Sequence, residues 1–235
     1  MLPVTFRLFK ATDEPESCER FILGHRKVLE IYGITMITSN KAAWVDHDNT
    51  YVILIESIDG KALGGARVQI ADDTLQLPIE EAVGKLDPRI HEVVNEHKIN
   101  KTGELCGLWN SREIAGFGAG SIYLTRACIA TAHNLKLTTL FGLAAPSTVR
   151  VASRAGFSIE RSLGNNGYFN YPKIDLIATA MIVKDLKNLS TAHEIDKESI
   201  FSLVHNPEKK QVETGPKGSL EIQYQLSLNR KLIHS

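Results

Sequence analysis

A glycine-rich segment that follows an apolar run is the first feature of this sequence that could do chemistry. Residues 110–120 read NSREIAGFGAG; they follow the apolar run 104–109 and precede a stretch of helical periodicity over 121–134. The first N–H groups of a helix have no partner inside the helix and carry partial positive charge, so they can bind an anion. This strand, loop and helix therefore predict a cradle for the diphosphate of a nucleotide or a coenzyme.

Composition favours small molecules as the other partners. The chain has 235 residues, 43% of them hydrophobic, which is enough for one full core without disulfides. Lys and Arg number 27 and so do Asp and Glu. This balance lacks the charge excess of a protein that binds nucleic acid or an anionic membrane surface. With no run of ~18 apolar residues and no signal-peptide pattern, we expect a cytoplasmic protein without membrane insertion.

Cysteine and histidine usage does not indicate a metal or redox site. The three cysteines, Cys18, Cys106 and Cys128, show no CxxC spacing, and two of them lie in apolar runs. Such thiols are usually inert core residues. We expect no bound metal, because no His, Cys and Asp spacing resembles a metal site. His25 lies on the apolar face of a predicted helix, which is typical of a core histidine.

The hydrophobic pattern predicts an α/β (α+β) fold with a mixed sheet and helices on both of its faces. Strands are expected at residues 4–9, 51–58, 62–70, 104–109, 137–144, 157–161 and 173–183, and helices from about 15 to Gly33, at 78–83, 88–97 and 121–134, and in a short stretch ending at 155. Asp59-Gly60 predicts a tight hairpin turn. Residues 35–49 have no clear period and are expected to form a loop.

The chain divides into a predicted domain over residues 1–186 and a C-terminal extension over 187–235. The extension is expected to contain a helix at 190–205, a polar loop at 206–218 and a strand at 219–228. A strand must pair with something. It could extend the edge of the sheet, cover a pocket or form a homodimer, and the sequence leaves these three alternatives open.

This order of elements resembles the GNAT superfamily of acyl-CoA N-acyltransferases over residues 4–184. Two motifs carry the resemblance: the strand, glycine loop and helix, and the closing segment 143–157, LAAPSTVRVASRAGF. The resemblance implies a mostly antiparallel sheet that splays open beside residues 104–109, with acyl-CoA or an acyl-carrier protein as the donor. The donor-binding residues that it implies are Cys106, Leu108, Trp109, Ser111, Arg112, Gly116, Phe117, Gly118, Ala119, Gly120 and Ser121.

A closer likeness is to the acyl-homoserine-lactone (autoinducer) synthases within that superfamily. The order of Arg26, the acidic loop 44–49, Arg67 on the second hairpin strand and the run 109–112 is similar to theirs. The substrate-binding residues that this likeness implies are Arg26, Trp44, Asp46, Asp48 and Arg67. The pattern differs at Asn49, where a second acid is expected, and at Trp109, where a glutamate is expected.

Two departures from the general acetyltransferase pattern concern the donor. Glu113 stands where a glutamine or arginine belongs, and a carboxylate directed at a diphosphate would repel it. Either the loop is shifted and Arg112 binds the phosphates, or Glu113 faces away. Ala152 stands where a tyrosine often protonates the departing thiolate; a thiol of pKa near ~8.5 is a tolerable leaving group without that help.

The resemblance implies an N-acyltransferase in which the amine of a small acceptor, for which an amino acid is one candidate, attacks the thioester directly. The backbone N–H groups of Leu108 and Trp109 would polarise the carbonyl oxygen, and Glu104 or a carboxylate of the acidic loop would take the proton. The alternative is a module that binds acyl-CoA and has lost catalysis, which the residues at 109 and 152 motivate.

Overall fold

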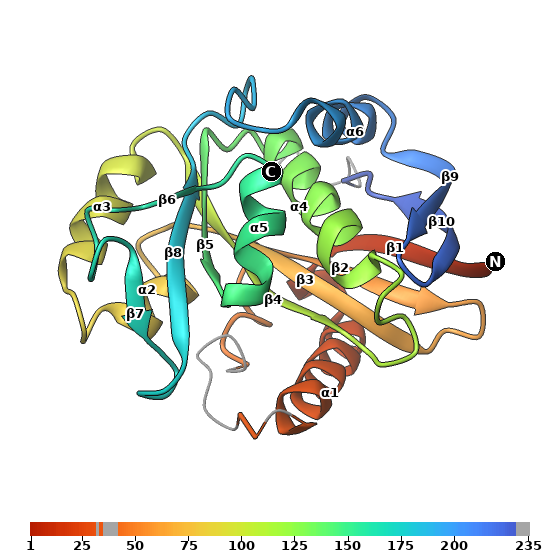
Figure 1. The fold of residues 1–235 in the computed structure, drawn as a ribbon, viewed down its shortest axis with the longest axis horizontal. Coiled ribbons are helices and arrows are strands. Elements are labelled where there is room, and N and C mark those ends of the chain that lie inside the picture. Colours follow the sequence, from red (N-terminus) through yellow and green to blue (C-terminus); the bar gives the residue numbers. More distant parts are fainter. Residues whose placement is uncertain (32, 35–41, 229–235) are drawn as a thin grey trace.

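The computed structural model describes residues 1–31, 33–34 and 42–228, and its centre is one mixed sheet (Figure 1). The strands follow the order β6-β8-β5-β4-β3-β2-β1-β10-β9, and β7 pairs with β8. Only the pairs β4·β5 and β1·β10 are parallel within the described chain. The strands are β1 Leu2–Lys10, β2 Thr50–Ser57, β3 Ala62–Ile70, β4 Thr102–Asn110, β5 Thr139–Ala144, β6 Ser158–Ile159, β7 Tyr168–Asn170, β8 Ile177–Val183, β9 Glu208–Gly215 and β10 Gly218–Gln225.

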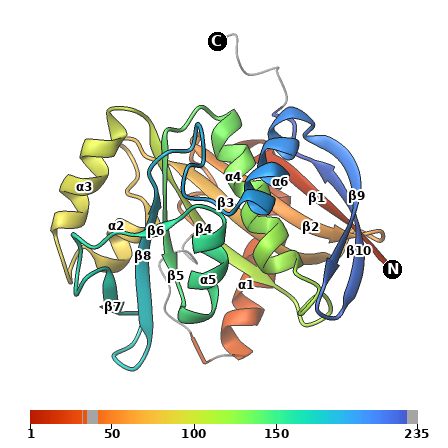
Figure 2. The same cartoon turned by 45° about the horizontal axis from the view of Figure 1, so that its top comes forward.

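Helices cover both faces of the sheet (Figures 1 and 2). They are α1 Pro15–Ile31, α2 Pro78–Val83, α3 Arg89–Lys98, α4 Leu124–Asn134, α5 Pro146–Arg154 and α6 Glu194–His205. On β5, Leu140 packs in one hydrophobic cluster with α4 and α6, while Phe141 packs in another with α2 and α3. Neighbouring residues of a strand face opposite sides, so these clusters lie on opposite faces. The predicted fold class is confirmed.

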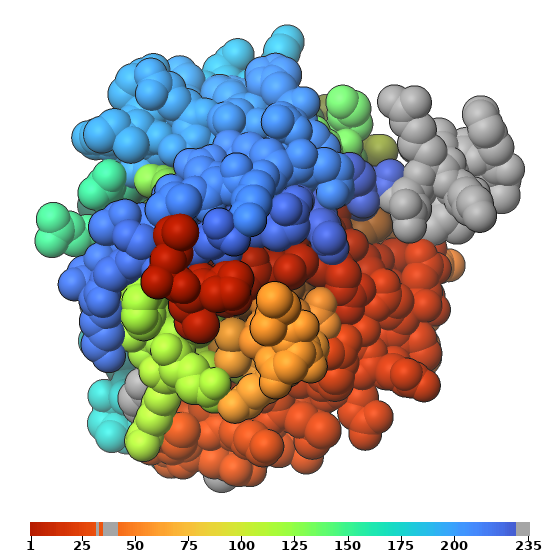
Figure 3. Space-filling model, turned by 90° about the vertical axis from the view of Figure 1, so that its right-hand side faces the viewer, coloured from red at the N-terminus to blue at the C-terminus, as the bar shows by residue number. Residues whose placement is uncertain are grey.

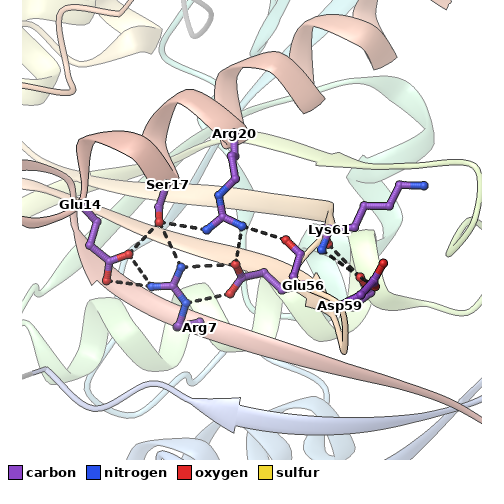
Figure 4. Close-up of polar contacts among 9 residues, drawn as sticks. Arg7, Glu14, Ser17, Arg20, Glu56, Asp59 and Lys61 are labelled. Atoms are coloured by element: carbon purple, nitrogen blue, oxygen red, sulfur yellow. Dashed lines mark hydrogen bonds and ion pairs between the residues drawn. The ribbon is translucent and has the colours of Figure 1, made fainter.

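Helix α1 lies on the same face as α2 and α3, and a polar network attaches its first turns to the sheet (Figure 4). Arg7 of β1 bridges Glu56 of β2, at 2.7 Å, and Glu14, at 2.6 Å, just before α1. Arg20 of α1 contacts the same Glu56 at 2.9 Å. The network positions the part of α1 that follows it, which contains the predicted core histidine.

The predicted polar loop at residues 206–218 is wrong, because most of it forms strand β9. This strand has alternating half-buried and exposed residues and pairs antiparallel with β10. Its Lys, Glu and Gln side chains carry no apolar face that would have indicated a strand, which is usual for an outer edge strand. Other elements also differ from the prediction. Strand β8 begins at Ile177 and helix α6 at Glu194, each four residues later than expected, and strand β7 was not predicted.

Of the three alternatives for the C-terminal strand, the structure has the first, an extended sheet edge. Strand β10 runs parallel to β1, from Leu2↔Leu220 to Arg7↔Gln225. Figure 3 shows the blue C-terminal segment lying along the red N-terminal strand. Ile200 of α6 and Ile222 of β10 belong to the same hydrophobic cluster as α4, so residues 187–228 share one core with the preceding chain.

A buried ion-pair group fastens α6 to the two helices beneath it. Asp196 is 3% exposed and accepts hydrogen bonds from Arg126 of α4, at 2.9 and 2.7 Å, and from Arg154 of α5, at 3.0 Å. Removing one partner of a buried ion pair leaves the other charges uncompensated. This group therefore contributes to the attachment of the C-terminal extension.

Asp196→Ala is expected to lower the free energy of unfolding by about 3–5 kcal/mol, the usual effect of breaking a buried ion pair. Urea denaturation followed by circular dichroism measures it. The matched control is Glu198→Ala on the exposed side of α6, which should change stability by about 0.5 kcal/mol or less. Equal effects of the two substitutions would contradict the anchoring role.

Candidate functional site

The centre of the site is the point where β4 and β5 separate. In the part of the chain that the structure describes, these strands pair in parallel from Thr102↔Thr139 to Leu105↔Gly142, and there the pairing ends. Both strands continue, β4 to Asn110 and β5 to Ala144. The backbone of β4 beyond Leu105 therefore has one side open to a gap in the sheet.

A β-bulge at Gly107 bends β4 at the start of this gap. Gly65 pairs with Trp109 but Arg67 pairs with Cys106, so β4 carries one extra residue between them. Gly107 has φ +61°, which favours glycine, and an added Cβ would lie 3.4 Å from the ring of Phe21. Because of the extra residue, the side chains at 104, 106 and 109 all face α1 and α2, while those at 105 and 108 face α4.

A cavity of about 520 Å³ fills the gap and reaches both faces of the sheet. Its α4 side is lined by Thr125, Val151, Ala152 and Met181, and its α1 side by His25, Leu29, Pro78 and Glu104. Most of the remaining wall is aliphatic. Two molecules that enter from opposite faces could therefore meet beside β4.

Glu104 is the buried acid of this cavity. It is 2% exposed, and its Oε2 accepts the backbone N–H of Ile79 in α2 at 2.7 Å. Burial raises the pKa of Glu104 to about 8, although the Ile79 N–H and the positive charge of Arg67 oppose the rise. A carboxyl group with this pKa can gain and lose a proton near neutral pH, as a general acid or base must.

Arg67 and Trp44, both predicted to bind substrate, lie together beside the cavity. Arg67 is 1% exposed, and its guanidinium carbon lies 4.3 Å from the centre of the Trp44 ring. Its Nε lies 3.5 Å from the position of a Cβ at Gly107. The positive charge of Arg67 opposes the rise in the pKa of Glu104 and contributes to the fall in the pKa of His25, so it acts on both of these cavity groups.

The two residues predicted to polarise the carbonyl oxygen differ in their surroundings. Leu108 lines the cavity, whereas the Trp109 ring packs on Phe21 at 5.9 Å and over Gly24. Ser111 N–H donates to Leu63 of β3. Since alternate residues of an antiparallel strand direct their N–H groups to the same neighbour, Trp109 N–H faces β3. Leu108 lies in the bulge, and a role for its N–H group at the carbonyl oxygen stays a prediction.

The glycine loop leads into a π-helical turn, Ala119–Tyr123, and then into α4. Gly116 and Gly118 both have φ +86°. An added Cβ at Gly118 would lie 2.8 Å from the Tyr123 ring, and one at Gly120 would lie 2.2 Å from the Asn110 side chain. The loop's own packing therefore requires these glycines. Phe117 and Ser121 are half-buried, Ala119 is buried, and the diphosphate site at this loop stays a prediction.

Glu113, just before the glycines of the loop, pairs with a lysine of another element, and the two alternatives raised from the sequence stay predictions. Its carboxylate forms an ion pair with Lys61 of the β2–β3 turn at 2.6 Å, and both side chains are exposed. The neighbouring Arg112 is also exposed, whereas Ser111 is half-buried. The negative charge of Glu113 is thus compensated by a surface lysine.

Three predicted substrate residues lie outside the cavity wall. Arg26, Asp46 and Asp48 are exposed, and Asp48 forms an ion pair with Lys10 of β1 at 2.5 Å. The amide of Asn49, where an acid was expected, donates to Asp72 at 2.7 Å and anchors the loop. The substrate roles of these three residues stay predictions.

Sequence reasoning missed two features of the site. The bulge at Gly107 had a signal, a glycine inside a strand. The contact of Gly24 with Trp109 had none, because a glycine inside a predicted helix does not indicate which distant ring lies over it. Among the described residues, no group of three metal-ligating side chains could hold an ion, and no helix has the length and apolar character to cross a membrane.

The comparison with known proteins shows a likeness of fold. No protein-family model matches the sequence, and no curated protein matches it. Solved structures do match. FeeM, an N-acyl amino acid synthase from uncultured soil microbes, has a TM-score of 0.62 at 15% identity, over 84% of this chain and 99% of FeeM.

Two further structures have the same fold. The CoA-dependent acyl-homoserine lactone synthase BjaI, with SAM and isopentyl-CoA, has a TM-score of 0.51 at 10% identity, over 86% of this chain and 90% of BjaI. An acyl-CoA N-acyltransferase from Pseudomonas aeruginosa has a TM-score of 0.50 at 16% identity, over 76% of this chain and 98% of the acyltransferase. The resemblance predicted from the motifs is confirmed at the level of the fold.

The raised pKa of Glu104 predicts how its substitution changes stability. Below pH 4.5 the carboxyl group is protonated in both states; between 4.5 and about 8 only the unfolded chain ionises, so stability is lost as pH rises. Glu104→Gln keeps an acceptor for the Ile79 N–H. It should match the wild type near pH 4.5 and exceed its free energy of unfolding by roughly 1–3 kcal/mol at pH 8. Urea titrations at both pH values check this, and a variant less stable at pH 8 would contradict it.

Proposed function

We propose that this protein transfers an acyl group from a thioester donor to the amine of a small acceptor. The observation that carries the proposal is the cavity through the sheet, which joins the open edge of β4 on one face to the buried acid Glu104 on the other. The donor and the acceptor can each enter from a different face of the sheet and meet there. The likeness of the fold to FeeM and BjaI supports the same reaction class.

The donor is acyl-CoA or an acyl-carrier protein, and it approaches from the side of α4 and α5. Its pantetheine arm lies along β4 from Cys106 to Trp109, where the end of the β4·β5 pairing leaves backbone groups for it. The diphosphate of coenzyme A lies at residues 116–121, at the start of the helical segment that leads into α4. Arg112, exposed at the entrance of this loop, contributes a charge-assisted hydrogen bond.

The acceptor approaches from the side of α1. Its amine nitrogen attacks the thioester carbon, and Leu108 N–H stabilises the negative charge that develops on the carbonyl oxygen. Glu104, once ionised, takes the proton that the nitrogen loses. The C–N bond forms, the C–S bond breaks, and the thiolate leaves and gains a proton from solvent. Arg67 beside the cavity favours an acceptor that carries a carboxylate, such as an amino acid.

The test of the reaction measures thiol released from acyl-CoA of short to long chain in the presence of a panel of amino acids. Glu104→Gln should lower kcat by about 10²–10⁴-fold and leave acyl-CoA affinity unchanged, because a general base acts only in the chemical step. The wild-type rate should rise with pH to about 8 through the ionisation of Glu104. Glu198→Gln, on the exposed side of α6, is the control.

The same assay separates the proposal from its alternative. Binding of acyl-CoA without turnover would favour a module that has lost catalysis. Neither binding nor turnover, across all chain lengths, would contradict acyl transfer and the binding module together.

Arg112→Ala tests the donor site at the loop. Calorimetry should show acyl-CoA affinity weakened by about 1.5–3 kcal/mol, the value of a charge-assisted hydrogen bond, with an unchanged melting temperature because Arg112 is exposed. A thioester of N-acetylcysteamine, which lacks the phosphates, should bind both proteins equally. Gly118→Val would not test the site cleanly, since the Tyr123 ring blocks the new side chain. Unchanged acyl-CoA affinity in Arg112→Ala would remove Arg112 from the site.

A further inference from the structure

His25 is a buried polar side chain in the wall of the cavity that the proposed chemistry does not use. It is 4% exposed and lines the cavity on the α1 side together with Glu104. Its Nδ1 atom is inaccessible to solvent and has no hydrogen-bond partner in the described part of the chain. Burying an unsatisfied nitrogen destabilises the folded state, so this position calls for a reason other than packing.

Packing by itself would favour an apolar residue at this position. Phe21, His25 and Leu29 follow one another at helical spacing on the buried face of α1. Phe21 packs in the core, with its ring centre 6.1 Å from that of His25, and Leu29 lines the cavity. A residue such as phenylalanine would fill the same face without an unsatisfied nitrogen.

The imidazole is neutral at physiological pH. Burial lowers the pKa of His25 to about 4, and the positive charge of Arg67 on β3 acts in the same direction. From β4, the carboxyl group of Glu104 and the thiol of Cys106 line the same cavity. Because Nδ1 is closed to solvent, a substrate can reach only the Nε2 side of the neutral ring. That nitrogen can donate a hydrogen bond to a hydroxyl or carboxylate oxygen or, in the other tautomer, accept one from an O–H or N–H group.

We propose that His25 positions the acceptor. Its imidazole forms a hydrogen bond with a polar group of the acceptor that lies next to the amine nitrogen of the acceptor. The inference rests on the proposed acyl transfer and extends it to the acceptor. It requires a substrate whose amine lies beside a hydroxyl, carboxylate or amide group, as in an amino acid. Glu104 then accepts the proton that the amine loses, and His25 orients the acceptor.

The experiment compares His25→Phe, which fills the space, with His25→Gln, which keeps a donor and an acceptor. In the 235-residue chain, His25→Phe should raise the acceptor KM at least tenfold and leave the KM for acyl-CoA unchanged, while His25→Gln should recover most of the loss. His193→Phe, at the exposed start of α6, is the matched control. An unchanged acceptor KM in His25→Phe would overturn the proposal.

The melting temperature supplies a second readout. If His25 had only a structural role, His25→Phe would lower the melting temperature. His25→Phe should melt at the same temperature as the wild type or higher, because the unsatisfied nitrogen is gone. The wild type should lose stability as pH falls from 6.5 to about 4, where the unfolded chain binds a proton that folded His25 does not. The variant should lack that part of the decline. A lower melting temperature with an unchanged acceptor KM would assign His25 to the core and overturn the inference.

A binding measurement separates failure of this inference from failure of acyl transfer. If the wild type shows no turnover, the His25 ring signals in an NMR spectrum, assigned by their absence from His25→Phe, are followed with coenzyme A present while each amino acid of the panel is added. A saturable shift with any of them supports His25 as the positioning group. Unchanged ring signals with every amino acid overturn it.

Discussion

The end of hydrogen bonding between β4 and β5 is the constraint on which the rest of the site depends. Two neighbouring parallel strands normally satisfy one another's backbone groups along their length, and an open stretch inside a sheet needs another partner. Here the pairing stops at Leu105 and Gly142, and the bulge at Gly107 turns β4 away from its neighbour. A cavity opens where a continuous sheet would have been solid. Every group assigned to the chemistry lines this cavity or lies next to it.

The cavity places polar groups in surroundings that disfavour their charged forms. Burial raises the pKa of Glu104 and lowers that of His25, so both side chains are predominantly neutral at pH 7. Desolvation at functional sites commonly raises the pKa of a carboxyl group above its usual range and lowers the pKa of an imidazole below its usual range. The free energy that this burial costs is offset by the apolar core on both faces of the sheet. The site is thus a destabilised part of an otherwise well-packed domain.

The C-terminal extension stabilises the fold at a distance from the cavity. It continues the sheet beyond β1, and α6 is tied to α4 and α5 through Asp196. Since α4 and α5 form one wall of the cavity, the extension supports that wall from behind. It also meets the glycine loop, because Lys217 N–H donates to the carbonyl oxygen of Gly116 at 3.0 Å. The extension therefore also contacts the loop before α4.

The sequence by itself determined the class of fold, most of the elements and the position of the glycine loop. Those features follow from local rules: alternation in β1, the turn at Asp59-Gly60 and helical spacing in α1 each depend on residues near one another in the chain. It also named Glu104 and Arg67, which the fold places at or beside the cavity. It failed at β9, whose polar alternation has no apolar face to reveal a strand.

Only the tertiary structure decided which of the candidate residues share one site. Asp48 was a candidate substrate residue and Glu113 stands beside the glycine loop, yet each carboxylate pairs with a lysine that is distant in sequence. His25 looked like a core residue because its helical face is apolar. Whether such a face meets a packed side chain or a cavity depends on where β4 and β5 part, and that is a contact between segments about 80 and 115 residues further along the chain. Local periodicity holds no information about such a contact.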